Sequence, residues 1–394
     1  MAAKGVRSRV RSGRPDGTPN GTVPATYNRF VLDLAVTDLC FAYGKGSPAV
    51  SEASFLIEKH THVALVGPAD CGASTLLKLI AGTLRPTSGE VRIGARDITR
   101  LSPRRRPILS VTSMTDAPPR WSVRHLLIAA ARQRSLDRED RRHELDLAAS
   151  RWRLDTLLER RLSTLSSTEW TLAALARVEL LRPAILLADR LLERANPSLL
   201  PWICDEWFRV LRIMGTTVVL APSSPLELGL IDALIVLERG RVVQQGTPSE
   251  VFRRPATAAA AEATGEVNRI PVVVRNGAVE SSIGAWQIAD RAIQGRQIAL
   301  ARPDDFAVAA PGEESDVIVA VEEASFRGGA WHVRGMLTGG VELHVVLPRS
   351  SSIHKGRLIP LRYDPARFRL VPPDDEDLAI EKVLPSVPTL KETR

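Results

Sequence analysis

The chain has 394 residues, of which 44% are hydrophobic and 25% are charged, as in a globular protein with two or three domains. No apolar run approaches the roughly 20 residues of a membrane-spanning helix, and no apolar segment follows the basic N-terminus as it does in a secretory signal. The three cysteines show neither metal-ligand spacing nor an even disulfide pattern, so we expect a reducing, cytoplasmic environment.

The net charge of +8 does not by itself predict a nucleic-acid partner. The arginines are scattered, and no helix-turn-helix, zinc or aromatic-interleaved basic motif accompanies them, so we expect no nucleic acid among the partners. Residues 1–29 combine Arg, Gly and Pro with the single acid Asp16 and are predicted to form a disordered basic arm. This arm is either a solvated tail or a tether to a membrane surface or a partner.

Residues 30–254 are predicted to form the first folded domain, in which apolar strands alternate with helices. Gly82 closes a predicted helix over 74–81, and the capping box TPSE opens a short helix at Pro248. Further helices are predicted over 169–181 and 198–214, and strands over 31–41, 53–57, 63–66, 90–93, 108–111, 185–188, 216–221, 234–237 and 241–245. The charged stretch 122–165 has helical periodicity, with an apolar face predicted from Leu145, Leu147, Trp152, Leu154, Leu157 and Leu158.

The segment GPADCGAST, residues 67–75, has the layout of a phosphate-binding P-loop. A buried strand, a glycine-rich turn and a helix start follow one another, and the backbone N–H groups of such a turn cradle phosphates. The segment supplies Gly67, Gly72, Ser74 and Thr75, but Ala73 stands where the motif requires lysine. Each lost charge-assisted hydrogen bond to phosphate would be worth roughly 1.5–3 kcal/mol.

The sequence pattern changes after residue 268. An alanine-rich stretch at 256–264 predicts a helix within a linker over 255–268. Short alternating runs separated by Gly, Pro and Asp then predict an all-β domain over 269–372, a small barrel or barrel-like sandwich. Residues 373–394 are polar and contain proline, so we expect a flexible tail.

The order of these motifs resembles the ATPase subunit of ABC transporters, in the maltose-type sugar-importer branch. The resemblance covers residues 31–372 and is carried by the segments GTPSEVFRRP, DALIVLERGRVVQQG, LARPDDF and RLIPLRYDPARFRL. It implies an α/β P-loop NTPase fold of the ABC type, with a mixed sheet, a parallel core and a helical subdomain at about 112–182. It also implies an all-β, barrel-like C-terminal domain of the OB or TOBE type.

Several residues match positions at which this family binds ATP and Mg²⁺, the cofactors that the resemblance implies. Tyr43 matches the aromatic residue that stacks on adenine, and Ser74 and Asp189 match the residues that hold Mg²⁺ and its water shell. Tyr43 is also explained as a packed surface aromatic, and Asp189 as a strand-end cap, so nucleotide binding stays open. The predicted nucleotide-binding positions are Tyr43, Gly67, Gly72, Ser74, Thr75 and Ser166.

The residues that perform hydrolysis in the family are replaced in this chain. Arg190 stands in place of the glutamate that acts on the attacking water, and a guanidinium cannot be a general base. Arg190 could instead pair with Asp70 or Asp189 and fill a vacant pocket. The signature reads LSSTE instead of LSGGQ, and no catalytic residue is predicted. The other replacements are Ser113 at the Q-loop, Asn196 at the D-loop and Pro222 at the switch histidine, with Asp70 added beside the expected phosphate.

The resemblance implies a subunit of a sugar or polyol importer, peripheral at the inner face of the cell membrane. Such subunits bind transmembrane subunits, act indirectly with a solute-binding protein, and pair so that one chain's P-loop faces the other's signature. The favoured interpretation is a hydrolysis-deficient pseudo-ATPase that pairs with a competent ATPase subunit, as a hetero-dimer rather than a homo-dimer. A slow ATPase in such a pair and a sensor or scaffold without a transport role are the alternatives.

Overall fold

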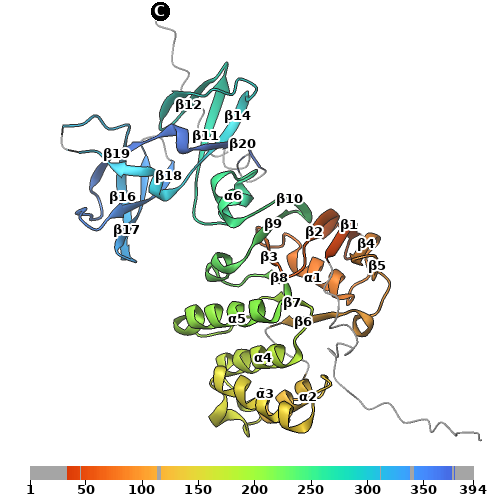
Figure 1. The fold of residues 1–394 in the computed structure, drawn as a ribbon. Helices are drawn as coiled ribbons and strands as arrows, with labels where there is room; N and C mark the ends of the chain where they lie inside the picture. Colours follow the sequence, from red (N-terminus) through yellow and green to blue (C-terminus); the bar gives the residue numbers. More distant parts are fainter. Residues whose placement is uncertain are drawn as a thin grey trace, which may run out of the picture.

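The structure is a computed structural model that describes residues 33–44, 46–112, 117–310, 312–337, 341–374 and 377. Figure 1 shows an α/β part and an all-β part that follows it in the chain. The predicted arm at 1–29, Ser113 and most of the predicted tail at 373–394 lie outside the described residues. Within the described ranges, no helix has the length and apolar character needed to cross a membrane.

An antiparallel sheet opens the α/β part. Its strands lie in the order β2, β1, β4, β5 and comprise β1 (Leu34–Phe41), β2 (Val50–Ile57), β4 (Ser88–Ile93) and β5 (Arg96–Asp97). The buried residues of β1, such as Leu34 and Val36, alternate with more exposed ones, as in a sheet with one face on a core. They pack with Leu76 of helix α1 (Ala73–Ala81) and with one face of the next sheet.

The second sheet places the site. Its order is β10-β9-β3-β8-β7-β6, with β3 (His62–Val66), β6 (Ile108–Thr112), β7 (Ile185–Asp189), β8 (Thr217–Ala221), β9 (Ala233–Glu238) and β10 (Arg241–Gly246). All neighbours are parallel except β10 and β9. Every residue of β3 and β8 is buried, as expected for strands covered on both faces. Because the strands are parallel, the loops that follow β3, β7 and β8 meet at one edge.

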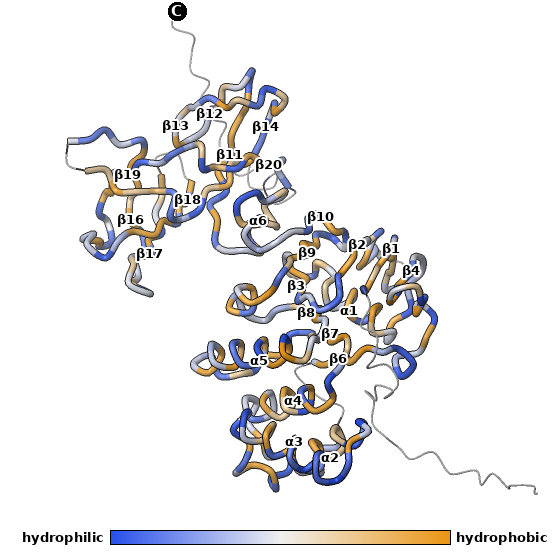
Figure 2. Tube along the Cα trace, viewed as in Figure 1, coloured by the Kyte–Doolittle hydropathy of each residue, from blue (hydrophilic) through white to orange (hydrophobic). Residues whose placement is uncertain are grey.

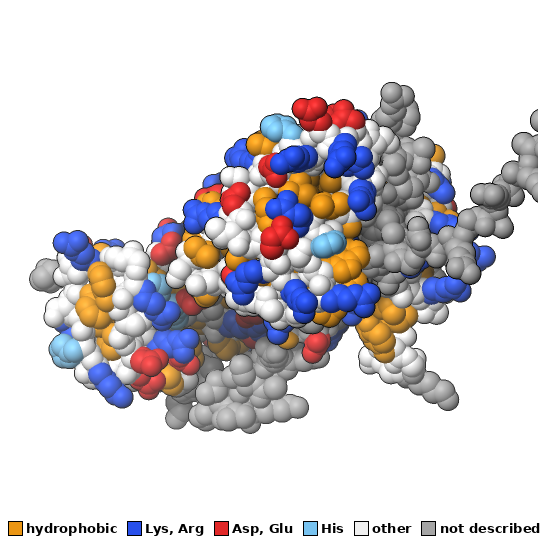
Figure 3. Space-filling view, turned by 90° about the horizontal axis from the view of Figure 1, so that it is seen from below, with side chains coloured by type: hydrophobic (Ala, Val, Ile, Leu, Met, Phe, Trp, Pro, Cys, Tyr) orange, Lys and Arg blue, Asp and Glu red, His pale blue; other side chains and the backbone are white. Residues whose placement is uncertain are grey.

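Helices α4 (Ser167–Leu181) and α5 (Leu200–Met214) lie on the second face of this sheet, and α2 (Val123–Ala131) and α3 (Arg138–Arg151) pack against α4, farther from the strands. Figures 1 and 2 show α4 and α5 below the sheet and the apolar residues gathered between the layers. Seen from below, Lys and Arg side chains lie among acidic and apolar ones rather than in one stripe (Figure 3). Glu144 of α3, for example, pairs with both Arg134 and Arg182.

The predicted apolar face of the stretch 122–165 is correct for most of its residues and wrong for one. Leu145, Trp152, Leu154 and Leu158 are buried, and Leu157 is partly buried, all within the same core. Leu147 is 50% exposed. Residues two apart on a helix point to nearly opposite sides, so Leu147 cannot share the buried face of Leu145.

A buried arginine donates hydrogen bonds to the carbonyl groups at the C-terminal end of α1. Arg106, which is 2% exposed, donates four hydrogen bonds to backbone carbonyls: Leu101 O at 3.0 Å, Leu79 O at 2.9 Å, Ile80 O at 2.6 Å and Thr99 O at 2.8 Å. Two of these carbonyls are in the last turn of α1, where a helix leaves its C=O groups without partners. Burial lowers the pKa of the Arg106 guanidinium to about 10.

The all-β part contains two antiparallel sheets of five strands each, β13-β12-β11-β14-β20 and β15-β19-β16-β17-β18. One core, which includes Ile270 and Val272 of one sheet and Val319 and Val345 of the other, lies between them. The strands are β11 (Asn268–Arg275), β12 (Ala278–Ser281), β13 (Gly284–Gln287), β14 (Gly295–Ala301), β15 (Phe306–Val308), β16 (Val317–Arg327), β17 (Ala330–Leu337), β18 (Glu342–Pro348), β19 (Leu358–Tyr363) and β20 (Arg369–Val371).

Helices α6 (Pro248–Arg253) and α7 (Ala258–Glu262) join the two parts. Ala260 of α7 is buried in the core of the α/β part, whereas Ala261 packs against Ile298 of β14. Arg302, at the end of β14, donates to Ala261 O at 3.0 Å and to Thr264 Oγ1 at 2.9 Å. Short 3-10 helices occur at Pro103–Arg105, Asp155–Leu157, Leu162–Thr164, Pro197–Leu199, Pro225–Leu230, Pro303–Asp305 and Pro365–Arg367.

Candidate functional site

The loop between β3 and α1 has a backbone that requires its glycines. Gly67 has φ +157° and Gly72 has φ +100°, a region that side chains rarely adopt. A Cβ atom on Gly67 would lie 2.0 Å from Leu237 O, and one on Gly72 would lie 2.4 Å from Ala49 O. The loop therefore passes so close to neighbouring backbone that only glycine fits at these two positions.

This loop lines a cavity of about 690 Å³. Five of the six predicted nucleotide-binding residues line it: Tyr43, Gly67, Gly72, Ser74 and Thr75. The other walls come from the loops after β7 and β8, with Arg190 and the segment 221–225, and from Ala263 next to α7. The volume lies within the range of small-molecule sites.

Ser74 and Asp189 meet at the base of the loop. The Ser74 hydroxyl donates to Asp189 Oδ1 at 2.8 Å, although the two residues start a helix and end a strand 115 positions apart. A hydroxyl and a carboxylate are the oxygen ligands that Mg²⁺ prefers. The arrangement suits a divalent cation beside an anion held by the backbone N–H groups of the loop.

Tyr43 stands at the mouth of the cavity and is 56% exposed. Its ring packs edge to face on Phe41, with the centroids 4.8 Å apart, and its hydroxyl lies 3.4 Å from Thr75 Oγ1. The ring is therefore anchored at one edge, while much of its surface is open to solvent. An exposed aromatic face can stack on a planar heterocycle.

Arg190 pairs with neither Asp70 nor Asp189. Its guanidinium forms an ion pair with Glu193 at 2.7 Å, so the pairing considered from the sequence is wrong. Glu193 lies three residues farther along the same turn, in which its N donates to Arg190 O at 3.2 Å, so the turn brings the two side chains together. Asp189 instead accepts the hydrogen bond from Ser74.

Ser166, the sixth predicted nucleotide-binding residue, is not among the described residues that line the cavity. It caps α4: Ser166 N donates to Glu169 Oε2 at 2.7 Å, and Glu169 N donates to Ser166 Oγ at 3.3 Å. Arg160 forms an ion pair with Glu169 at 3.1 Å. The hydrogen bond from Ser166 N, chiefly, lowers the pKa of the Glu169 carboxyl.

Thr168 connects the start of α4 to the loop after β7. Its Oγ1 accepts a hydrogen bond from Asn196 N at 2.9 Å, and Asn196 Oδ1 in turn accepts one from Ser198 N at 3.0 Å. The positions that the resemblance assigns to the signature and the D-loop are thus joined by a direct bond. Thr168 supplies a side-chain acceptor that a glycine could not.

Sequence reasoning missed a buried carboxylate beneath the loop after β8. Glu227 is 1% exposed and accepts hydrogen bonds from Ser223 N, Ser223 Oγ and Ser224 N at 2.8, 2.9 and 3.0 Å. Burial raises the pKa of the Glu227 carboxyl against the opposing effect of these donors. The spacing of Ser224 and Glu227, a capping box, was the available signal.

The cavity has little positive charge to offer a phosphate. Among the described residues that line it, the charged ones are Asp70 and Arg190, and none is a lysine. Ala73, at the start of α1, presents a methyl group there. Any anion would therefore depend mainly on the backbone N–H groups of the loop.

Comparisons with known proteins agree with this architecture. The chain is 31% identical over 316 residues to the sn-glycerol-3-phosphate import ATP-binding protein of Rhizobium meliloti (strain 1021), covering 79% of this chain and 89% of that protein. It is 28% identical over 345 residues to a protein of the same description from Agrobacterium fabrum, covering 86% and 97%.

The structure of cbiO1 from Clostridium perfringens, part of the ABC transporter complex cbiONQ, matches with a TM-score of 0.50 and 25% identity, covering 56% of this chain and 90% of that one. A sequence model described as ABC transporter matches residues 50–192. The predicted fold class, an ABC-type P-loop fold followed by an all-β barrel-like domain, is confirmed. The chain belongs to the family of ABC transporter ATP-binding proteins.

Proposed function

We propose that this chain is a hydrolysis-deficient ATP-binding subunit of an importer, which serves as structural or regulatory partner to a competent ATPase subunit. The observation that carries this proposal is the cavity, in which Ala73 starts α1, Arg190 is held by Glu193, and no described lining residue is a lysine. The loop that requires Gly67 and Gly72 and the Ser74–Asp189 contact support the view that the shape of a nucleotide site is retained.

Hydrolysis needs a cation on the transferred phosphate and a group that orients or deprotonates water. Neither Ala73 nor Pro222 offers a charge or a side-chain hydrogen bond where they line the cavity. Arg190 is permanently charged and cannot accept the proton of the attacking water. Loss of these functions together is expected to leave binding but not turnover.

We assign nucleotide and Mg²⁺ contacts to the retained residues. In this assignment Tyr43 stacks on adenine, Gly67, Gly72 and Thr75 shape the phosphate loop, and Ser74 and Asp189 hold Mg²⁺. Ser166 would meet the nucleotide of a partner subunit, because it lies away from the chain's own cavity. The capping box of Ser166 and Glu169 supports a rigid start of α4 at such an interface.

The partner is proposed to be a second, competent ABC subunit rather than a second copy. In a homo-dimer both sites would combine a loop without lysine with the LSSTE signature.

The carboxylate of Glu169 accepts a hydrogen bond from Ser166 N and pairs with Arg160, so it repels a phosphate less than a free acid would. Transmembrane importer subunits, and a solute-binding protein acting through them, complete the proposed assembly at the inner face of the membrane.

The solute class follows from the relatives. Two of them are described as importing sn-glycerol-3-phosphate, a phosphorylated polyol. We propose a sugar, a polyol or a polyol phosphate for the importer that contains this chain. The division of the chain into 30–254, a linker at 255–268 and a β domain at 269–372 belongs to the same proposal.

Calorimetry and a turnover assay on the purified chain test the proposal. We expect Mg²⁺-dependent ATP binding that Asp189→Asn weakens, with no phosphate release from either protein. A matched variant that combines Ala73→Lys, Arg190→Glu and Pro222→His should show turnover above the wild-type chain. Phosphate release by the wild-type chain alone, at a rate typical of ABC ATPases, would refute the assignment.

The Ser74–Asp189 contact favours one alternative, a slow ATPase within a mixed pair. This alternative predicts turnover only when an intact partner subunit is present, and loss of that turnover when the partner's catalytic glutamate is mutated. Asp189→Asn in this chain distinguishes the two functions, because turnover of the pair should persist under the main proposal and fall under the alternative.

A further inference from the structure

Two histidines lie side by side on the outer face of the second β sheet. His332 is on β17 and His344 is on β18, and in the strand register His332 pairs with Val346 while His344 pairs with Arg334. The two histidines therefore occupy diagonal positions on the same face of neighbouring strands. Their flanking residues Val333 and Val345 point into the core, so the imidazoles point away from it.

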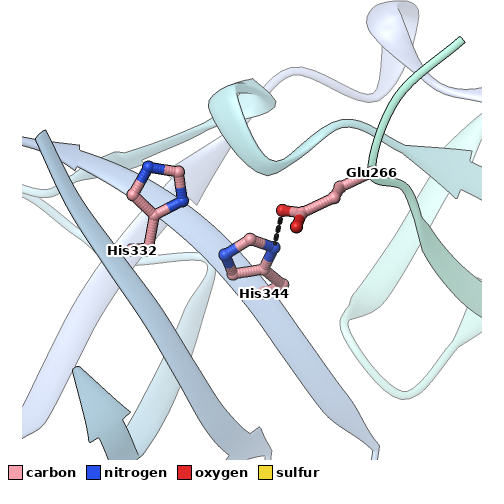
Figure 4. A group of neighbouring side chains, drawn as sticks. All are labelled: Glu266, His332 and His344. Carbon is pink, nitrogen blue, oxygen red and sulfur yellow. Dashed lines mark ion pairs between the residues drawn. The ribbon is translucent and has the colours of Figure 1, made fainter. Parts of the chain in front are cut away.

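A carboxylate from another segment completes the group. Glu266 precedes β11, and its Oε2 lies 2.6 Å from His344 Nδ1. The two imidazole rings are stacked with their centroids 5.6 Å apart. Figure 4 shows Glu266 reaching from its segment toward His344, with His332 on the adjacent strand. One ligand atom of each residue lies within 4.8 Å of the other two.

We propose that Glu266, His332 and His344 form a binding site for a divalent transition metal of the zinc type. Two imidazoles and one carboxylate are a ligand set used by zinc sites that keep a fourth position for water. The inference goes beyond the proposed function and is independent of it, because these residues lie in the all-β part rather than around the nucleotide cavity.

The geometry requires only a small closure. Metal–ligand bonds of about 2.1 Å place tetrahedral ligand atoms about 3.4 Å apart. The ligand atoms of the three residues lie within 4.8 Å of one another, so they need to approach by at most roughly 1.4 Å. Glu266 supplies this freedom, because its side chain is 63% exposed. Replacing the Glu266–His344 ion pair by two metal bonds keeps both groups satisfied.

Strand β18, which carries His344, is held by hydrogen bonds to Asn268, and this lowers the entropy cost of ordering the ligands. Asn268, two residues after Glu266, donates to His344 O at 2.8 Å and accepts from His344 N at 2.7 Å. Arg327 and Arg334 place positive charge near His344 and oppose a bound cation, so we expect these two arginines to weaken metal binding.

The metal would connect two separate pieces of the chain. Glu266 lies between α7 and β11, whereas β18 is the edge strand of its sheet. A bound metal would fix the segment that leads from the α/β part to this edge. The predicted consequence is a metal-dependent rise in the stability of the all-β part.

The test uses the full chain without an affinity tag, stripped with EDTA and then titrated with Zn²⁺ or Co²⁺. We expect one equivalent of bound metal, a higher melting temperature with Zn²⁺, and a Co²⁺ absorption band of tetrahedral nitrogen and oxygen ligation without sulfur charge transfer. His332→Ala and Glu266→Gln should each weaken binding at least tenfold. His354→Ala, which removes an exposed histidine of the same all-β part, should bind like the wild-type chain.

His332→Gln guards against a variant that simply unfolds, because it keeps a polar side chain on the strand. If this variant melts like the metal-free wild-type chain but no longer binds Co²⁺, the proposal is supported. Equal Co²⁺ binding by the wild-type chain, His332→Ala and His332→Gln would overturn it. Absence of any stoichiometric metal on the wild-type chain would overturn it as well.

Discussion

Arg106 gives the sharpest prediction, which concerns the stability of α1, the helix that follows the loop after β3. Arg106→Met keeps a long side chain but removes every donor to Leu79 O, Ile80 O, Thr99 O and Leu101 O. Leu79 O retains a bond from Gly82 N, while the other three carbonyls lose the donor that the arginine gives them. A buried acceptor without a partner costs about 1–3 kcal/mol, which applies to Ile80 O, whereas Thr99 O and Leu101 O are only partly buried and cost less.

Relief from burying a guanidinium offsets part of this cost. We expect a net loss of about 3 kcal/mol, because one carbonyl becomes a buried acceptor without a partner and two partly buried carbonyls lose a charged donor. Urea unfolding followed by tryptophan fluorescence measures this loss, because Trp152 and Trp207 are fully buried in the adjoining core. A loss of this size is a large fraction of the 5–15 kcal/mol typical of a folded protein.

Two matched variants make the Arg106 result interpretable. Arg105→Met changes the exposed neighbouring arginine and should alter the free energy of unfolding by about 0.5 kcal/mol or less. Arg106→Lys keeps a charge but gathers its donors at one point, so an intermediate loss is expected. If Arg106→Met were no less stable than Arg105→Met, the assignment of Arg106 as the cap of α1 would be refuted.

Three further predictions concern the cavity at the loop between β3 and α1 and the segment after β8. Ala73→Lys should tighten Mg²⁺–ATP binding by about 10–150-fold relative to Ala73→Met in calorimetry, from about 1.5–3 kcal/mol of charge-assisted bonding, and equal affinities would contradict it. Gly67→Ala should lower the free energy of unfolding by about 2 kcal/mol or more, because its Cβ would lie 2.0 Å from Leu237 O. The control Gly46→Ala should not, because the atom nearest its Cβ is 3.9 Å away. Similar unfolding curves for the two variants would contradict this prediction. Burial raises the pKa of the Glu227 carboxyl in the folded chain, so protonated Glu227 stabilises the fold. This stabilisation is fully present below the unfolded pKa of about 4.3 and is lost as pH rises through the folded pKa. Glu227→Gln should therefore gain stability relative to the wild-type chain between pH 4.5 and 7.5 in urea titrations, and a difference that does not change with pH would be inconsistent with it.

The sequence predicted the arrangement around β3 and α1 well. An apolar run, a glycine-rich turn and a helix that ends at Gly82 are local signals, and in the structure this turn and Tyr43 line one cavity. The parallel order of the second sheet followed from the family resemblance, which also placed Asp189 at the end of a strand.

The features that the sequence did not predict depend on contacts between distant segments or on competition between partners. Nothing local distinguishes Arg106 from Arg105, because only the folded chain brings Leu79 and Ile80 to one of them. The sequence suggested Asp70 or Asp189 as the partner of Arg190, and the structure pairs it instead with Glu193 on its own turn. Leu147 was misassigned because the stretch contains several leucines in helix and turn, and the sequence alone did not show which of them share the buried face of α3.

Helix α7 has a consequence for how this protein can be divided or recombined. Its alanines contribute to two cores at once, with Ala260 on one side and Ala261 on the other, and Arg302 reaches back from the β sheet to close the contact. A crossover or proteolytic cut placed anywhere in 255–268 would strip buried surface from both products. An exchange of the all-β part between relatives therefore has to carry α7 and the residue at position 302 together.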